Sequence, residues 1–189
     1  MAGDAQATRK RLLDAAAAEF AAYGIAGARV DRIAETARSN KAQIYHYYGS
    51  KDALFDAVFN ALVVETVSEI PIDADDLPEY AGRLFDRYEA RPDVVRLATW
   101  HRLERGQDQG LLDSVVTSTR DKVEAVARAQ KTGTLPATYS AAELLVLVLH
   151  LSMLWATMTP EFGVVLGRHS RARRRALVTG AVAALVAQR

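Results

Sequence analysis

The stretch from residue 41 to residue 51, KAQIYHYYGSK, holds the residues with the clearest capacity for chemistry. It has a lysine at each end and, between them, a glutamine, a histidine and three tyrosines. Lysine and tyrosine suit the oxygens of a phosphate backbone, and glutamine can hydrogen-bond to base edges. A catalytic site would need an acid or a nucleophile nearby, and this stretch contains no acidic residue. These residues indicate contact with nucleic acid, although the rings could instead form the polar edge of a helical core.

The charged residues of the chain are distributed unevenly. Residues 1–51 contain eight lysines and arginines and five acidic residues, residues 52–167 contain ten and eighteen, and residues 168–189 contain six and none. The middle of the chain therefore repels a polyanion, whereas the N-terminal part can accept one. The formal net charge of +1 hides this division.

Length and composition limit the class of protein. With 189 residues, 50% of them hydrophobic, the chain can build a sizeable core in one or two domains. It has no cysteine, hence no disulfide and no thiolate metal site. The charged N-terminal residues lack the apolar segment of a signal peptide, so we expect a cytoplasmic protein. The apolar residues 144–158 fall short of the roughly 20 that a bilayer needs and should form a buried helix.

Apolar residues recur with helical period along nearly the whole chain, and the sequence therefore predicts an all-α protein. We expect the first helix to run from an N-cap at Thr8 to Tyr23 and to end at a left-handed Gly24. Further helices are expected over residues 30–37, 41–48, 51 to at least 62, 79–90, 92–105, 111–131, 141–158 and 170–188, with breaks that include 70–78, 106–110, 132–140 and 159–167. Predicted caps are Asn40, Gly49, Ser50 and Ser140, the last in a capping box with Glu143.

The short helices 30–37 and 41–48, separated by three residues, have the arrangement of a helix-turn-helix. In such a motif the second helix enters the major groove, where an alanine methyl can touch a thymine methyl. A tyrosine can pack its ring against the small head while its hydroxyl reaches a phosphate. The motif thus accounts for the crowded aromatic residues.

The stretch from Arg9 to Leu62 resembles the TetR family of bacterial transcriptional regulators. The segments LLDAAAAEFAAYG, VDRIAETA and above all IYHYYGSKDALF carry the resemblance. It implies a three-helix DNA-binding head, residues 1–52, joined by a fourth helix to a five-helix body, residues 53–189, for effector binding and dimerisation. It also implies DNA contacts at base edges by Lys41, Ala42, Gln43 and His46, and at the backbone by Tyr45, Tyr47, Lys51 and Arg29.

Three positions need separate comment. Arg38 stands in the turn where the family usually has glycine, and a left-handed arginine there costs about 1–2 kcal/mol, so the turn could be shaped differently. Arg29 replaces the family's Thr or Ser cap and, while able to reach phosphate, cannot cap. Asp31 matches a position that sometimes contacts bases, and it could accept a hydrogen bond from cytosine. The alternative for Asp31 is a solvated carboxylate.

The last two expected helices are predicted to form a homodimer interface. Residues 144–158 are apolar on all sides and must be covered on all sides. The resemblance implies a four-helix bundle about a two-fold axis, and a dimer would place two recognition helices about 34–36 Å apart on a palindromic operator. The predicted interface residues are Leu147, Leu151, Leu154, Leu177, Gly180, Ala181, Ala184 and Leu185.

The resemblance also implies a small effector bound in the body. The candidate pocket residues, each of which could equally be core, are Phe85, Tyr88, Trp100, His101, His150, Met153, Trp155 and Met158. Such a lining suits a hydrophobic ligand. No cofactor or metal ion is expected. The basic run Arg168–Arg175 could extend the DNA contact, but its place in the body favours a solvated, dimer-rim or acidic-partner face.

Two other classes compete with a regulator. An enzyme would need a catalytic motif, and neither paired Glu-x-x-His segments nor a zinc-protease or phosphate-loop motif occurs. A helical interaction module that has lost operator binding is the better alternative, and its binding would respond little to salt. The sequence therefore predicts a homodimeric regulator, a repressor, that binds double-stranded DNA and a small effector and does not enter a membrane.

Overall fold

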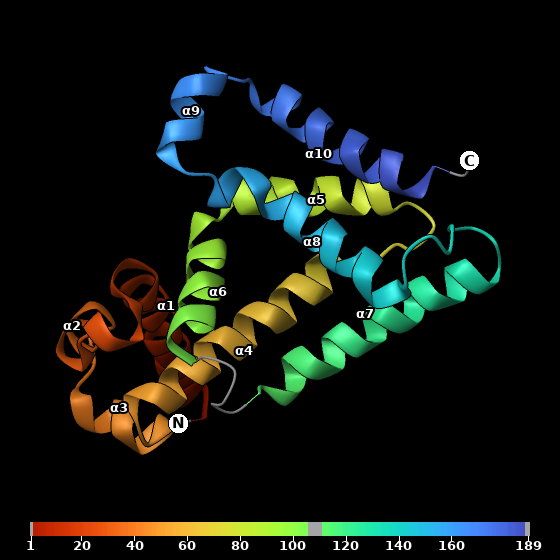
Figure 1. Ribbon diagram of the computed structural model, residues 1–189. Helices are drawn as coiled ribbons and strands as arrows, with labels where there is room; N and C mark the ends of the chain where they lie inside the picture. Colours follow the sequence, from red (N-terminus) through yellow and green to blue (C-terminus); the bar gives the residue numbers. More distant parts are fainter. Residues whose placement is uncertain (1, 106–110, 188–189) are drawn as a thin grey trace. The chain divides into compact units, whose positions relative to one another are not determined.

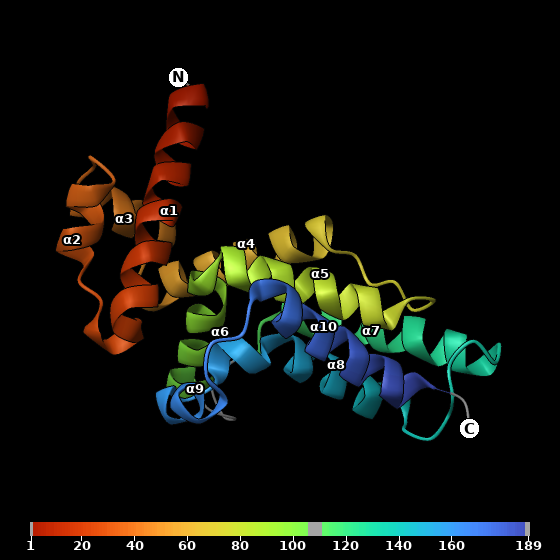
Figure 2. The same cartoon turned by 90° about the horizontal axis from the view of Figure 1, so that it is seen from above.

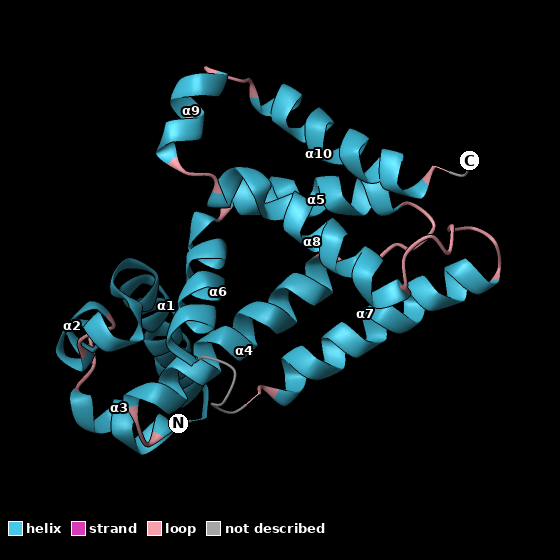
Figure 3. Cartoon of the chain, in the orientation of Figure 1, coloured by secondary structure: helices cyan, strands magenta, loops and turns pink. Residues whose placement is uncertain are grey.

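The computed structural model describes residues 2–105 and 111–187, with the main chain alone for residues 2–4. All regular structure within these ranges is helical, as the sequence predicts (Figure 1, Figure 3). The helices are α1 (Ala2–Gly27), α2 (Val30–Thr36), α3 (Lys41–Tyr48), α4 (Lys51–Glu69), α5 (Leu77–Ala90), α6 (Pro92–Arg105), α7 (Asp113–Lys131), α8 (Ala141–Thr157), α9 (Pro160–Leu166) and α10 (Arg171–Val186). The break expected at 106–110 lies outside the described residues.

Contacts between residues divide the chain into two compact units. Unit 1 comprises Met1–Glu65 and Asp93–Val115, and unit 2 comprises Thr66–Pro92 and Val116–Arg189. Helix α6 thus packs with the first three helices and most of α4. The assignment of DNA binding to residues 1–52 and of effector binding to residues 53–189 stays a prediction about function.

Helix α1 starts earlier than the sequence predicts. It begins at Ala2, so Thr8 lies inside the helix, where its hydroxyl accepts a hydrogen bond from Arg11 Nη2 at 2.9 Å. The prediction of Thr8 as N-cap was wrong, because the alanine-rich segment before it continues the helix. Gly24 has the positive φ that the prediction requires, 72°, but its ψ of −178° lies outside the left-handed helical region. Helical turns resume after this kink and continue to Gly27.

Local capping defines the helix-turn-helix, as the sequence predicts. Asn40 Oδ1 accepts from the backbone N of Gln43 at 2.9 Å and starts α3. Gly49 ends α3 in a positive-φ conformation, and Ser50 Oγ accepts from the backbone N of Ala53 at 3.0 Å to start α4. These caps depend only on neighbours within four residues, which is why the sequence alone could place them.

Arg38, in the turn between α2 and α3, is left-handed with φ 50°. Among the described residues it is the one non-glycine with positive φ. The turn therefore keeps the conformation that a glycine would favour. The sequence had left open that Arg38 would change the shape of the turn, and it does not. The arginine side chain costs about 1–2 kcal/mol in this conformation.

Replacing Arg38 by glycine is expected to raise the free energy of unfolding by about 1 kcal/mol, because the strained conformation loses its Cβ. Urea unfolding followed by circular dichroism measures the change. Arg29→Gly is the matched control, since Arg29 is exposed and extended, with φ −117°. Equal midpoints for Arg38→Gly and the native protein would show that the turn is not strained.

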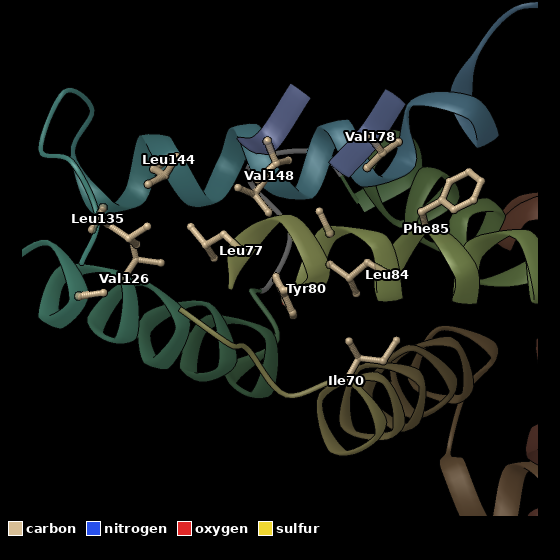
Figure 4. Close-up of a cluster of buried hydrophobic side chains, with 14 residues drawn as sticks. Ile70, Leu77, Tyr80, Leu84, Phe85, Val126, Leu135, Leu144, Val148 and Val178 are labelled. Atoms are coloured by element: carbon tan, nitrogen blue, oxygen red, sulfur yellow. The ribbon is translucent and has the colours of Figure 1, made fainter. Parts of the chain in front are cut away.

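The core of unit 2 forms where α5 contacts both α8 and α10, which also contact each other. These three helices lie side by side in both views (Figure 1, Figure 2). One turn of α7 closes the core through Val126 (Figure 4). The main buried side chains of this cluster are Leu77, Tyr80, Leu84, Phe85, Val126, Leu144, Val148, Val178 and Val182.

Helix α8 begins with the predicted capping box, in which Ser140 and Glu143 each accept from the other's backbone N. It ends at Thr157, and the expected break at 159–167 contains a further helix, α9, which buries none of its residues. Within the described residues no single helix is long and apolar enough to cross a membrane. The bent pair α8 and α9, with 85° between them, passes that test of length and composition together.

The basic run from Arg168 to Arg175 binds the acidic residues of α5. The ion pairs join Arg171 to Asp86 (2.6 Å), Arg174 to Glu89 (2.5 Å), and Arg175 to Glu79 (2.6 Å) and Asp86 (2.8 Å). The sequence suggested a solvated face, a dimer rim or an acidic partner for this run. The structure shows an acidic partner, which is helix α5 of the same chain. These contacts fix α10 against α5.

Candidate nucleic-acid interface

Helix α3 has one buried anchor and a polar outer face. Ile44 is fully buried, whereas Lys41, Ala42, Tyr45 and His46 are exposed. Positions 41, 42, 45 and 46 share one face of a helix, because residues three and four apart are neighbours on its surface. This is the face that the second helix of a helix-turn-helix presents to the major groove.

The two remaining tyrosines of α3 connect it to α1. The Arg9 guanidinium lies 4.8 Å from the centre of the Tyr47 ring, and Tyr48 Oη donates to the Arg9 carbonyl at 3.4 Å. Burial raises the pKa of Tyr48. Tyr48 is therefore part of the packing, while Tyr45, with 49% of its surface exposed, is available to a ligand.

Gln43 and Lys51 already have partners within the head. Gln43 is half-buried and its Oε1 is hydrogen-bonded to Ser39 Oγ. Lys51 Nζ donates to the carbonyl oxygens of Ala26 (3.1 Å) and Ala28 (3.2 Å), just beyond the kink of α1. A base or a phosphate would have to compete with these contacts.

Glu19 binds the N-terminal end of α2, where Arg29 provides no side-chain cap. Arg29 makes no side-chain cap for α2, but its backbone N donates to Glu19 Oε1 at 2.9 Å. Arg32 Nε donates to the same oxygen at 2.8 Å. Burial of Glu19 opposes its ionisation, but these donors outweigh it and lower the pKa of the carboxyl group. This contact could not be predicted from local sequence patterns, because Glu19 lies ten residues before Arg29.

Asp31 and Lys41 form an ion pair between α2 and α3. Both side chains are largely exposed, at 62% and 57%. The pair lies at the first turn of each helix, beside the exposed face of α3. Asp31 is thus a solvated carboxylate that also touches a candidate DNA-binding residue.

Helix α6 binds the kink of α1 through a carboxylate. Glu104 Oε1 accepts from the backbone N of Ile25 at 2.9 Å, and Oε2 accepts from that of Ala26 at 2.7 Å. These amides are available because Gly24 interrupts the helical hydrogen bonding. Arg96 Nε adds a bond to the Ala21 carbonyl at 2.7 Å. The sequence did not predict this contact, since it joins residues about eighty positions apart.

Two family descriptions match the chain. Residues 12–58 match the one entitled "Bacterial regulatory proteins, tetR family", and residues 76–183 match "Tetracyclin repressor-like, C-terminal domain". The chain belongs to the TetR family. It is therefore a DNA-binding transcriptional regulator and not an enzyme.

Relatives agree with this assignment. The HTH-type transcriptional repressor SCO4008 of Streptomyces coelicolor is 37% identical over 170 residues, which cover 87% of this chain and 86% of SCO4008. The repressor NicS of Pseudomonas putida is 32% identical over 113 residues, 56% of this chain and 53% of NicS. The crystal structure of the transcriptional regulator SCO4942 from S. coelicolor has a TM-score of 0.83 and 38% identity, covering 94% of this chain and 97% of that one.

The residues predicted for the effector pocket of this TetR-family chain fall into both units. In unit 1, His101 stacks on Phe59 at 4.3 Å between ring centres, and Trp100 Nε1 donates to the Ala21 carbonyl at 3.4 Å. Burial, with a further contribution from Arg105, lowers the pKa of His101. In this unit Trp100 contacts α1 of the head, whereas His101 contacts α4.

The unit 2 candidates differ in burial. Phe85 is buried, and burial raises the pKa of the half-buried Tyr88 to about 12. His150 is exposed and bonds to the Val146 carbonyl of its own helix at 2.8 Å. Trp155 Nε1 donates to the Arg174 carbonyl at 3.2 Å. Met153 and Met158 are half-buried.

The predicted dimer residues of this TetR-family regulator lie on α8 and α10 and differ in exposure. Leu154 and Leu177 expose 46% and 37% of their surfaces. Gly180 and Ala184 are also exposed, whereas Leu147, Leu151, Ala181 and Leu185 are half-buried. A Cβ added at Gly180 would meet no atom within 4 Å. This face of α10 is therefore open in the single chain.

Proposed function

We propose that the protein is a transcriptional repressor that binds a palindromic operator as a homodimer and is released by a small, mainly hydrophobic effector. The exposed polar face of α3 carries the DNA-binding part of the proposal. Lys41, Ala42 and His46 would face base edges, and Tyr45 and Tyr47 would hold the backbone. The names of the repressors SCO4008 and NicS support repression.

The proposal gives less weight to Gln43, Lys51 and Arg29 than to the exposed residues of α3. Gln43 and Lys51 would have to exchange their contacts in the head for DNA, so the substitution of either would also disturb the head. Arg29 keeps an exposed side chain for phosphate, because only its backbone N is bound by Glu19. The proposal therefore depends most on Lys41, Tyr45 and His46.

The homodimer would form through α8 and α10. Exposed leucines and an open glycine on these helices support it, since apolar side chains and small residues permit close packing of helices across a two-fold axis. Val146 of α8 is also apolar and exposed, although it was not among the residues predicted from the sequence. Two heads related by such an axis would meet successive major grooves of one operator.

The effector would bind in the helical body, with Phe85 and Tyr88 as the candidates among the aromatic residues of α5. Their apolar neighbours favour a hydrophobic ligand. The proposed effector site does not include His150, because its side chain is exposed to solvent. We further propose that the protein acts in the cytoplasm, where its DNA is found.

Selection of bound duplexes from a random pool, at two salt concentrations, tests this function. The expected result is a palindrome whose affinity falls steeply with salt and falls about tenfold or more in Lys41→Ala, which removes one charged base contact. Lys10→Ala is the matched control, because Lys10 is an exposed lysine of α1 paired with Asp14. Binding without a recovered motif and without salt dependence would instead support the helical interaction module.

A further inference from the structure

The contact between Asp31 and Lys41 places a carboxylate beside an ammonium at the proposed DNA-binding face. A pair as exposed as this one adds little to the stability of the fold. Both groups remain accessible to a ligand, and both belong to the first turns of α2 and α3. The pair therefore presents a hydrogen-bond donor next to an acceptor.

We propose that Asp31 and Lys41 together recognise one G·C base pair in each half of the operator. The proposal rests on the binding of α3 in the major groove. There the G·C pair presents the acceptors N7 and O6 on guanine and the N4 amino donor on cytosine. Lys41 donates to the guanine acceptors, and Asp31 accepts from the cytosine amino group.

The spacing of the ion pair fits the spacing of these base atoms. Guanine O6 and cytosine N4 are hydrogen-bonded to each other, so a hydrogen-bond length separates them. Asp31 Oδ1 and Lys41 Nζ are likewise in direct contact. The ion pair can therefore lie across the base pair without being broken, since the ammonium group has three donors and the carboxylate several acceptor sites.

The position of purine N7 distinguishes G·C from T·A. In a T·A pair, thymine O4 would face Lys41 and adenine N6 would face Asp31, but adenine N7 would then lie on the side of the carboxylate. Two acceptors would oppose each other there, and the thymine methyl group would face the ammonium. In the G·C pair the N7 acceptor lies on the side of Lys41, where it is favourable.

Duplex selection with Asp31→Asn tests this role separately from DNA binding itself. The native protein is expected to select G·C at one symmetric position of each half-site, and Asp31→Asn to weaken that preference about tenfold or more. An asparagine side chain can donate as well as accept, so it tolerates other pairs at that position. The preferences at the other positions should stay unchanged.

Glu35→Gln is the matched control, because Glu35 is the other acidic residue of α2 and is also exposed. Both substitutions remove one negative charge and should raise non-specific affinity alike. Unchanged base preferences in Asp31→Asn, or an equal change in Glu35→Gln, would overturn the proposal. If the native protein itself selects no palindrome, then the proposed function fails.

A double-mutant cycle between Asp31→Asn and Lys41→Ala completes the test. If the two side chains recognise one base pair as a unit, the double variant should lose no more discrimination at that position than Lys41→Ala alone. Additive losses at that position would show that the two side chains act on it independently and would overturn their action as a unit. Unchanged thermal unfolding of the single variants, expected from their exposure, excludes misfolding as the cause.

Discussion

Gly24→Ala is expected to lower the free energy of unfolding by about 2–4 kcal/mol, because an alanine is strained at this positive φ and the Glu104 hydrogen bonds would be lost. The Cβ of the alanine would collide with Glu104 Oε1 and would lie 2.9 Å from Trp100 Cε3. Neither neighbour can withdraw freely, because Glu104 holds two backbone amides and Trp100 is hydrogen-bonded to α1.

Urea unfolding of unit 1 can be followed through Trp100 if Trp155 is replaced by phenylalanine in every variant. Gly27→Ala is the matched control, since Gly27 lies in the same helix without a positive φ and its added Cβ would make an ordinary 3.4 Å contact with Tyr23. That variant should be neutral or gain up to about 1 kcal/mol from helix propensity. Similar unfolding midpoints for the two variants would contradict the role of the kink.

The double variant Gly24→Ala with Glu104→Ala identifies the source of the loss. If the added Cβ acts by displacing Glu104, the two substitutions should destabilise together by less than the sum of their separate effects. Additive losses would assign the effect of Gly24→Ala to backbone strain alone.

Gly180→Leu is expected to weaken binding to the full palindrome by about 10²- to 10⁴-fold, because the two linked heads would no longer bind together. The leucine would block close approach of a second α10 at the proposed dimer interface. It should not unfold the single chain, since a Cβ at Gly180 meets nothing within 4 Å. Leucine also favours a helix over glycine by about 0.5–1 kcal/mol.

Sedimentation equilibrium and binding to full and half operators measure this prediction. The dimer should dissociate in Gly180→Leu, whereas affinity for a half operator should stay near that of a native head. Gly180→Ala is the control, because it gains the same helix propensity with far less bulk. A Gly180→Leu protein that remains dimeric would place the interface elsewhere on the chain.

The sequence by itself determined the features that depend on near neighbours. Helical period predicted the all-α class, and the caps at Asn40, Ser50 and Ser140 involve partners within three residues. The family's motif around α3 likewise predicted the helix-turn-helix head. The failure at Thr8 is also local, because a good capping residue does not prevent helix formation by the residues before it.

Helix α9 shows the limit of local patterns. Its segment contains a proline and two glycines at residues 159–167 and was expected to be a break, yet it forms a short helix with no buried residue. A proline is compatible with the first turn of a helix, which is where this proline lies. The apolar residues of α9, which include Phe162, Val164 and Val165, are exposed, and a segment of seven residues is too short to show a helical period.

Only the tertiary structure decided how charged and polar residues are used. Glu19 binds Arg29 and Arg32 at the start of α2, Glu104 binds the kink of α1, and the arginines of α10 bind the carboxylates of α5. Each of these residues looks in the sequence like an ordinary exposed charge. Its partner comes from a different helix, at a separation that no local spacing encodes, so it is fixed only when the helices pack.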